Sequence, residues 1–410
     1  MDNKRRDEEA TQKDARRGVK KLMSSKMVIK SYQPKSILNV QKHIDGGWFW
    51  VKYSAFPYLG CQYGCEYCYW RDEKYNPHKP SRDPEVLEFE DAFSQYIKIK
   101  ENAAELLGKE LSKKPKDLIY LDHYQPVEAK ERLTREMLKV CLDLGFPVFI
   151  NEKSPLVLND LDILKEISKK TYLTVAWSII TTVDGKTRRI FEPKAPSVKA
   201  RFEAMKKFSE AGISTGTVFM PVLPFIHDDE KNIEAVIKKT KECGGEYVLE
   251  GGLTLWGYCK THFYKVLEKH KPLLLAGYKT LYDRKNKKQD PWLTHTITIH
   301  SLVKKYCQKY DIKNYIPRPV NFFPEHLQIN KKVAADFFLR AREIQLSSGM
   351  NYKYWALQKA AWAIDELNQD IKEIYKNQGK KGLLAIKGVG KSIAETIGEF
   401  LENKELEEVI

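Results

Sequence analysis

The sequence predicts an α/β protein in which parallel strands alternate with helices and a small all-α segment follows. Between residues 46 and 260, short apolar runs alternate with segments of helical period. Such near-continuous apolar runs are typical of strands that helices cover on both faces. After residue 330 the apolar residues recur only at helical spacing, and a single glycine-rich turn interrupts them.

Six strand-to-helix units can be placed in order along the first part of the chain. The strands are expected at 48–51, 117–122, 147–151, 172–179, 215–222 and 246–250. The main helices between them are expected at 128–144, 161–167, 198–211 and 232–243. Six such units suggest a partial (β/α)6 TIM-like barrel, in which functional side chains follow the carboxyl ends of the strands.

Composition limits the class of protein. The 410 residues leave room for two or three domains, and a net charge of +15 favours polyanionic partners such as nucleic acid. No apolar run of about 18 residues occurs, so no membrane span is expected. Seven cysteines, three of them in one loop, fit a reducing cytoplasm better than a disulfide framework.

The composition also divides the chain. We expect a basic N-terminal arm at 1–45, the barrel at 46–260, a helical extension and linker at 261–330, and a helical module at 331–410. The arm lacks the apolar core of a signal peptide. It either contacts a phosphate backbone or is a solvated tail. The sequence predicts no role for residues 256–315.

One loop carries three thiols at a C-x3-C-x2-C spacing, from Cys61 through Cys65 to Cys68. Iron–sulfur clusters are usually held by four cysteines, so three would leave one iron open to another ligand. A zinc site is the first alternative, with His78 as the fourth ligand that structural zinc requires. Three inert thiols packed as small hydrophobic groups are the second.

With Tyr67 just before the last cysteine, the loop resembles that of radical S-adenosylmethionine enzymes. The resemblance implies a 4Fe-4S cluster held by the three cysteines, with S-adenosyl-L-methionine bound at the open iron. It also implies an electron donor such as ferredoxin or flavodoxin. The transferred electron would split the cofactor and yield a 5′-deoxyadenosyl radical.

Residues 35–255 also resemble the branch of this family that contains spore photoproduct lyase. The resemblance rests on FPYLGC at 56–61, YQPVE at 124–128, EKS at 152–154 and FEP at 191–193. It implies that Tyr67, Lys153 and Ser178 contact S-adenosylmethionine. The lyase quenches its radical with a cysteine near the second strand, where this chain has no thiol. Tyr120 or Tyr124 is therefore a tentative hydrogen relay.

Near the C-terminus, a Gly-Val-Gly turn (388–390) separates two predicted helices. Gly388 and Gly390 permit positive φ and the close approach of a partner. Lys387 and Lys391 flank the start of the second helix, where backbone amides favour a phosphate.

This stretch resembles a helix-hairpin-helix, and residues 336–408 resemble the small N-terminal domain of the DNA polymerase beta family. The matching residues are Gly349, Tyr352, Lys353, Tyr354, Lys359, Ala360, Ala361, Ile364, Ile371, Gly388, Val389, Gly390, Ile393, Ala394, Phe400 and Leu401. The resemblance implies sequence-tolerant binding of the DNA backbone. Thr396 stands where some members have a Schiff-base lysine, so no lyase chemistry is expected from this module.

Together these features predict a radical S-adenosylmethionine enzyme that repairs a damaged base in DNA. Because a base inside a duplex cannot reach a barrel mouth, the target would be flipped out or single-stranded. The alternatives are an enzyme that modifies RNA and a cluster-stabilised nucleic-acid-binding protein without catalysis. A metabolic radical enzyme whose helical module binds a partner protein is a further alternative.

Overall fold

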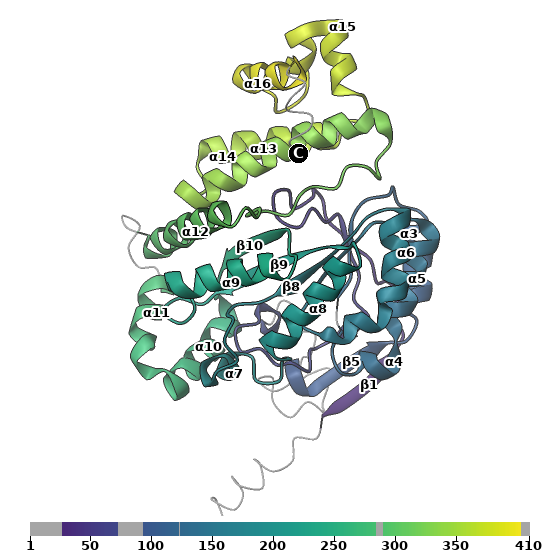
Figure 1. Cartoon of the computed structure of the whole chain (residues 1–410). Helices are drawn as coiled ribbons and strands as arrows, with labels where there is room; N and C mark the ends of the chain where they lie inside the picture. Colours follow the sequence, from purple (N-terminus) through teal and green to yellow (C-terminus); the bar gives the residue numbers. More distant parts are fainter. Residues whose placement is uncertain (1–26, 73–92, 123, 284–289, 403–410) are drawn as a thin grey trace, which may run out of the picture.

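A seven-stranded sheet forms the centre of the molecule (Figure 1). The computed structural model describes residues 27–72, 93–122, 124–283 and 290–402. The strands follow the order β10-β9-β8-β7-β6-β3-β2, and all pairs are parallel except β2 with β3. Their bounds are β2 (Asn39–Val40), β3 (Tyr53–Ser54), β6 (Ile119–Tyr120), β7 (Val148–Glu152), β8 (Leu173–Ser178), β9 (Ser214–Val222) and β10 (Tyr247–Gly252). This mixed α/β arrangement is the predicted partial barrel.

Helices cover the outer face of the sheet because alternate strand residues are apolar on that side. Val148 and Ile150 of β7, with Val175 and Trp177 of β8, belong to one buried cluster with the apolar faces of the neighbouring helices. These helices are α3 (Ala103–Leu111), α5 (Leu133–Leu144), α6 (Leu161–Lys170) and α8 (Val198–Glu210). The rest of the outer layer is α7 (Lys186–Phe191), α9 (Glu230–Glu242), α10 (Gly257–His270), α11 (Leu275–Tyr282) and α12 (Pro291–Lys309).

The other strand residues share a second buried cluster with helix α13 (Glu325–Ser348). Phe149 and Val218 belong to this cluster, as do Trp50 and Phe338. The rings of Trp50 and Phe338 meet edge to face with centroids 5.9 Å apart. A Cβ on Gly46 would lie 2.3 Å from the Phe338 ring, so only glycine fits there. The predicted domain boundary between residues 330 and 331 falls inside α13, which shares this buried cluster with residues of the sheet.

Two local predictions were wrong. Residues 48–51, expected as a strand, form a turn in which Trp50 has a φ of 63°, and the first parallel strand is β3. The turn is held by Asp45, whose carboxylate accepts from the Val51 amide at 2.8 Å. The helix expected over 128–144 is interrupted at Arg132, which has a φ of 54° and divides α4 (Glu128–Glu131) from α5. An apolar run indicates that a segment is buried, and a buried turn can have the same apolar pattern as a strand.

A smaller sheet of order β1-β5-β4 supports the segment that leads into the cysteine loop. Its strands are β1 (Val28–Tyr32), β5 (Tyr96–Lys100) and β4 (Tyr58–Leu59). Residues 1–26 of the predicted basic arm lie outside the described residues. Across the described part of the chain, no helix combines the length and apolar character needed to cross a bilayer.

The C-terminal helices lie at the end of the molecule where the strands begin; the first packs along α13, and the last two lie beyond that pair (Figure 1). They are α14 (Tyr352–Asp365), α15 (Ile371–Leu384) and α16 (Lys391–Glu402), with residues 385–390 joining the last two. Asp365 is buried with the Arg318 guanidinium and lies 3.3 Å from the Lys331 ammonium. Burial raises the pKa of Asp117, which lies just before β6, to about 6. The nearby Asp365 carboxylate contributes a smaller increase to the same pKa. Figure 1 accordingly shows α15 and α16 at the opposite end of the molecule from β5 and α10.

Candidate metal and cofactor site

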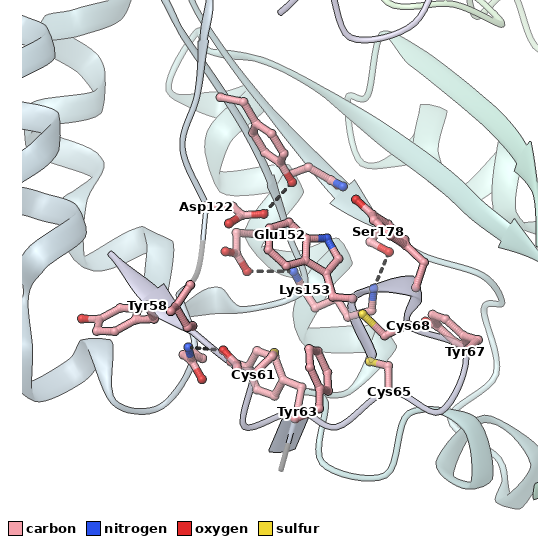
Figure 2. A pocket seen from close by; sticks show the side chains of 18 residues that line it. Tyr58, Cys61, Tyr63, Cys65, Tyr67, Cys68, Asp122, Glu152, Lys153 and Ser178 are labelled. Carbon is pink, nitrogen blue, oxygen red and sulfur yellow. Dashed lines mark hydrogen bonds between the residues drawn. The ribbon is translucent and has the colours of Figure 1, made fainter. Parts of the chain in front are cut away.

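Cys61, Cys65 and Cys68 line one pocket of about 220 Å³ beyond the carboxyl ends of the strands (Figure 2). Their loop begins after β4 at Gly60, which has a φ of +81°. A Cβ at Gly60 would lie 2.6 Å from the Tyr96 carbonyl, so glycine is required by both conformation and space. The Cys61 amide donates to the Phe93 carbonyl at 2.9 Å, which fixes the start of the loop.

Side chains outside the pocket hold the remainder of the loop. The Arg71 guanidinium donates to the carbonyls of Gly64 at 2.8 Å and Cys65 at 2.9 Å. From α10, the Cys259 thiol donates to the Tyr69 carbonyl at 3.2 Å. These contacts satisfy buried backbone carbonyls that the irregular loop cannot pair by itself. These contacts fix the positions of the cysteines. No local sequence pattern predicted the contacts.

Burial raises the pKa of the Cys65 thiol to about 12 and also raises the pKa values of Cys61 and Cys68. Because metal ligation requires thiolates, loading the site would release protons. Within the described ranges, no three His, Cys, Asp or Glu side chains surround a single ion position. A multi-iron cluster needs no such convergence, whereas zinc does. His78, the predicted fourth zinc ligand, lies outside the described residues.

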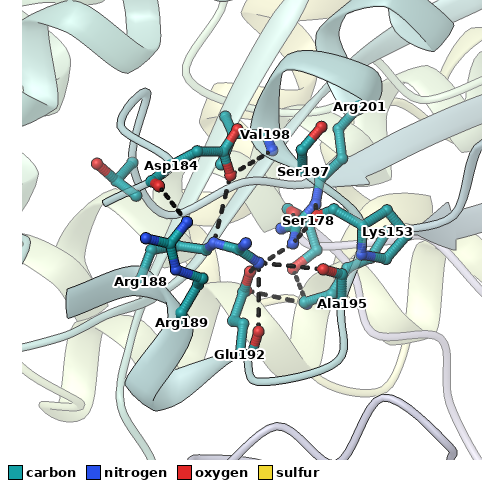
Figure 3. Close-up of polar contacts among 12 residues, drawn as sticks. Lys153, Ser178, Asp184, Arg188, Arg189, Glu192, Ala195, Ser197, Val198 and Arg201 are labelled. Carbon is teal, nitrogen blue, oxygen red and sulfur yellow. Dashed lines mark hydrogen bonds and ion pairs between the residues drawn. The ribbon is translucent and has the colours of Figure 1, made fainter. Parts of the chain in front are cut away.

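Lys153 and Ser178, predicted on separate strands, meet in this pocket (Figures 2 and 3). They follow or end the paired strands β7 and β8, so parallel pairing brings them to the same edge of the sheet. The Lys153 ammonium donates to the Ser178 hydroxyl at 2.5 Å. The pair therefore presents a cation and a hydroxyl beside the cysteines.

A buried carboxylate, Glu192, holds Lys153 in place (Figure 3). Its oxygens accept from the Arg201 guanidinium at 2.5 Å and from the Tyr67 hydroxyl, and one lies 3.9 Å from the Lys153 ammonium. Burial raises the pKa of Glu192, but the cations of Arg201 and Lys153 outweigh it and lower the pKa to about 2. Glu192 is thus ionised and balances the buried positive charge.

The same group of residues connects to the pocket wall. Arg201, which is fully buried on α8, also donates to the Ser178 carbonyl at 2.9 Å. Tyr67 directs its hydroxyl to Glu192, while its ring lines the pocket with the Lys153 ammonium 5.8 Å from the ring centroid. Sequence reasoning identified Glu192 within the FEP motif but did not predict Arg201. An arginine on an amphipathic helix usually faces solvent, so its sequence gives no signal of burial.

The two tyrosines proposed as hydrogen relays are placed differently. Tyr120 lines the pocket and donates to the Asp122 carboxylate at 2.5 Å. Burial raises the pKa of Asp122 to about 7. Tyr124 is only 1% exposed, and its hydroxyl donates to Asp160 at 2.9 Å on the side of the core helices. Of the two, only Tyr120 is among the residues that line the pocket.

Aromatic side chains that the sequence did not single out complete the pocket. Tyr69 and Trp70 directly follow Cys68 and line the cavity. The Phe56 ring meets Trp70 at 5.4 Å with an interplanar angle of 86°. It also meets Tyr120 at 5.6 Å and 87°. Phe56 thus supports both rings edge-on.

The predicted DNA-binding residues lie far from the pocket, on the turn between α15 and α16. Gly388 has a φ of +97°, and a Cβ on Gly390 would meet nothing within 4 Å. Lys387 and Lys391 are exposed beside them. Gly388 thus has the positive φ that the sequence allowed for both glycines, whereas Gly390 does not, and the turn between α15 and α16 lies at the opposite end of the molecule from β5 and α10 (Figure 1).

Comparison with known proteins found relatives that match slightly more than half of this chain. No family model matches the chain. Uncharacterized protein MJ0683 of Methanocaldococcus jannaschii is 32% identical over 235 residues, covering 56% of this chain and 79% of the relative. Uncharacterized protein Rv2578c of Mycobacterium tuberculosis is 26% identical over 240 residues, covering 57% of this chain and 68% of the relative.

Two solved structures align at lower identity. A spore photoproduct lyase mutant with dinucleoside spore photoproduct aligns with a TM-score of 0.48 and 13% identity, over 71% of this chain and 82% of that chain. Streptococcus suis SuiB bound to S-adenosylmethionine aligns with a TM-score of 0.37 and 13% identity, over 74% of this chain and 51% of that chain.

Proposed function

This chain belongs to the protein family that includes MJ0683 of Methanocaldococcus jannaschii, and we propose that it is a radical S-adenosylmethionine enzyme acting on a damaged base in DNA. The observation that carries the proposal is the meeting of two groups in one pocket. Three thiols at C-x3-C-x2-C spacing line it together with the Lys153–Ser178 pair. The first group suits a cluster with one open iron, and the second suits a polar cofactor bound beside it.

The pocket residues fit these groups by their chemistry. Cys61, Cys65 and Cys68 would hold a 4Fe-4S cluster, and Lys153 with Ser178 would bind the carboxylate or ribose hydroxyls of S-adenosylmethionine. If the cluster were bound and reduced by a donor such as ferredoxin or flavodoxin, its electron would cleave S-adenosylmethionine to methionine and a 5′-deoxyadenosyl radical. Glu192 and Arg201 keep Lys153 and Ser178 in position before the cofactor arrives, which lowers the entropic cost of binding.

The aromatic lining has a protective role in this proposal. Tyr63, Tyr67, Tyr69 and Trp70 line the pocket around the thiols. Apolar ring surface excludes water and prevents side reactions of a reactive species. Tyr120 lies within the same lining and carries the O–H group that the proposed hydrogen relay needs.

We propose that the turn between α15 and α16 binds the DNA backbone. The space at Gly390 is open, α16 begins at the next residue with unpaired backbone amides that would bind a phosphate, and Lys387 and Lys391 add positive charge. Because this turn and the pocket lie at opposite ends of the molecule, the turn would hold DNA that flanks the target, while the target nucleotide enters the pocket by flipping out.

The test is anaerobic reconstitution with iron and sulfide, followed by reduction with S-adenosylmethionine and ultraviolet-damaged DNA. We expect wild-type protein to carry a 4Fe-4S cluster, to release 5′-deoxyadenosine, and to convert a base in the damaged DNA. Cys65→Ala should lose all three. Cys141→Ala, which removes a fully buried thiol of the outer core, is the matched control and should keep the cluster.

Each contrary result identifies another function. Tight zinc without iron uptake would refute the cluster. An intact cluster that never yields 5′-deoxyadenosine would indicate a structural cluster in a nucleic-acid-binding protein. Faster cofactor cleavage with RNA, but not with damaged DNA, would indicate RNA modification. Cleavage that no nucleic acid affects would favour a small-molecule substrate and a protein partner for the helical module.

A further inference from the structure

The geometry points to a stacking subsite for a planar nucleobase on the Trp70–Tyr120 side of the pocket. This inference rests on the proposed function and deepens it, because it states which part of the nucleic acid enters and which side chains receive it. Trp70, Tyr69 and Tyr120 line the cavity and are linked by ring contacts, Tyr69 to Trp70 directly and Trp70 to Tyr120 through Phe56. Lys153 and Ser178 form a hydrogen-bonded pair in the same lining.

The rings on this side are held in position before any ligand binds. Phe56, which is 8% exposed and does not belong to the pocket lining, meets both Trp70 and Tyr120 edge-on. Phe149 also packs against Tyr120, with ring centroids 5.3 Å apart. The Tyr120 hydroxyl is fixed by Asp122 at 2.5 Å. Rings fixed in this way lose little conformational entropy when a planar group stacks on them.

A carboxyl group beside these rings suits the donor edge of a base. The carboxylates of Asp122 and Glu152 both line the cavity. The Asp122 carboxyl group can accept a hydrogen bond from an N–H group on the edge of a base, while the Glu152 oxygens already accept from the backbone amides of Tyr124 and Lys153. Aromatic faces with nearby carboxylate acceptors therefore suit a neutral ring with donors on its rim. Of the groups that a nucleic acid offers, only the base has that chemistry.

The competing occupant of these rings is the adenine of S-adenosylmethionine. The two possibilities predict different consequences for a Trp70 variant. If adenine stacks there, removing the indole weakens binding of the cofactor. If the substrate base stacks there, removing the indole weakens binding of the nucleic acid and leaves the affinity for the cofactor unchanged.

The experiment measures equilibrium binding to reconstituted protein and needs no turnover. The probes are S-adenosylmethionine, an ultraviolet-irradiated thymine-containing trinucleotide, and the same trinucleotide with abasic sites. Stacking of one base is worth about 1–3 kcal/mol, which is roughly 5- to 150-fold in Kd. We expect Trp70→Ala to weaken binding of the base-containing trinucleotide by that factor, and Trp70→Phe to restore much of the lost affinity. The abasic probe should bind both variants with equal affinity.

Phe225→Ala is the matched control, because it removes a ring that is 49% exposed and lies outside the pocket lining. Iron content is measured on every sample. If Trp70→Ala loses iron, Tyr69→Ala provides the same comparison at a ring that is 45% exposed and not needed for the core. Unchanged trinucleotide affinity, or a loss confined to S-adenosylmethionine, would overturn the subsite. If the wild-type protein binds the trinucleotide with the expected dependence on Trp70 but never cleaves the cofactor, the proposed function is refuted and the subsite is retained.

Discussion

The two ends of this molecule use charge in different ways. At the pocket, Glu192 and Arg201 are fully buried and paired, and they hold Lys153 and Ser178 in a fixed geometry. At the opposite end, Lys387 and Lys391 stand exposed beside a glycine turn. Buried pairs keep their interaction in salt, whereas exposed charges attract at long range and are screened within about 10 Å at 0.1 M salt. The buried charges of the pocket therefore fix the positions of Lys153 and Ser178, whereas the exposed lysines of the turn would attract a polyanion.

The largest expected effect comes from breaking the buried pair. Glu192→Ala leaves the Arg201 and Lys153 cations without their counter-charge, which should cost about 3–5 kcal/mol in the free energy of unfolding. Glu203→Gln on the same helix as Arg201 removes an exposed carboxylate paired with Lys199 at 3.8 Å, and should cost less than about 1 kcal/mol. Urea denaturation of both variants measures the difference. Equal costs would remove the distinction between the two ends.

The same pair predicts a pH dependence. The pKa of Glu192 is about 2 in the folded protein, below its ordinary value of 4.5. A depressed carboxyl pKa contributes stability that is fully present above pH 4.5 and is lost as the pH falls towards 2. The stability gap between wild type and Glu192→Ala should therefore shrink as the pH is lowered through that range. A gap that stays constant would show that the carboxylate is not charged.

A comparable loss is expected from the contact that joins the two ends. Phe338→Ala on α13 removes a ring that is fully buried between Trp50 and Gly46. Large-to-small changes at such sites cost about 3–5 kcal/mol. Leu339→Ala, a partly buried neighbour on the same helix, should cost less. A small effect at Phe338 would mean that α13 is dispensable to the barrel and that residues 331–410 can be removed as a unit.

A smaller effect is expected at the pocket pair itself. Lys153→Ala should weaken S-adenosylmethionine binding by about 1–3 kcal/mol because its partner loses a charge-assisted hydrogen bond. Iron content should stay at the wild-type level, since the thiols lie on another loop. Lys169→Ala, an exposed lysine on α6, is the control. Intact iron with wild-type affinity would identify Lys153 as a structural cation, and loss of iron would assign it to the support of the cysteine loop.

The smallest effect per residue is expected at the glycine turn. The double variant Lys387→Ala, Lys391→Ala should weaken DNA binding by a similar factor for every sequence and lower the salt slope by about 2. Lys206→Ala with Lys207→Ala removes the same charge from exposed positions on α8. Equal effects of the two double variants would show that only the net charge attracts DNA and that the turn has no specific part.

Local patterns were sufficient for much of the fold and for part of the site. Period and apolar runs located β7 to β10 and the helices between them, because strands covered on both faces must be apolar throughout. The cysteine spacing identified the loop, since three thiols within eight residues have few other uses. Lys153 and Ser178 were singled out by the resemblance to the spore photoproduct lyase branch, and their positions at the ends of apolar strands agree with it, because parallel strands end at one edge.

Other features depended on contacts between residues far apart in the chain, to which no local pattern refers. Arg201 looks like any arginine on a surface helix, yet Glu192 draws it into the core. Trp48 to Val51 reads as a strand, but the Asp45 carboxylate and the Phe338 ring stabilise a turn there. Phe56 supports Trp70 and Tyr120 only because the first and second strand units lie side by side. The sequence by itself determined the parallel α/β order and the thiol loop, because both follow from short-range spacing. The tertiary structure decided which charges are buried together, which rings face the pocket, and how far the glycine turn lies from the cysteines, because burial and proximity are properties of the packed chain.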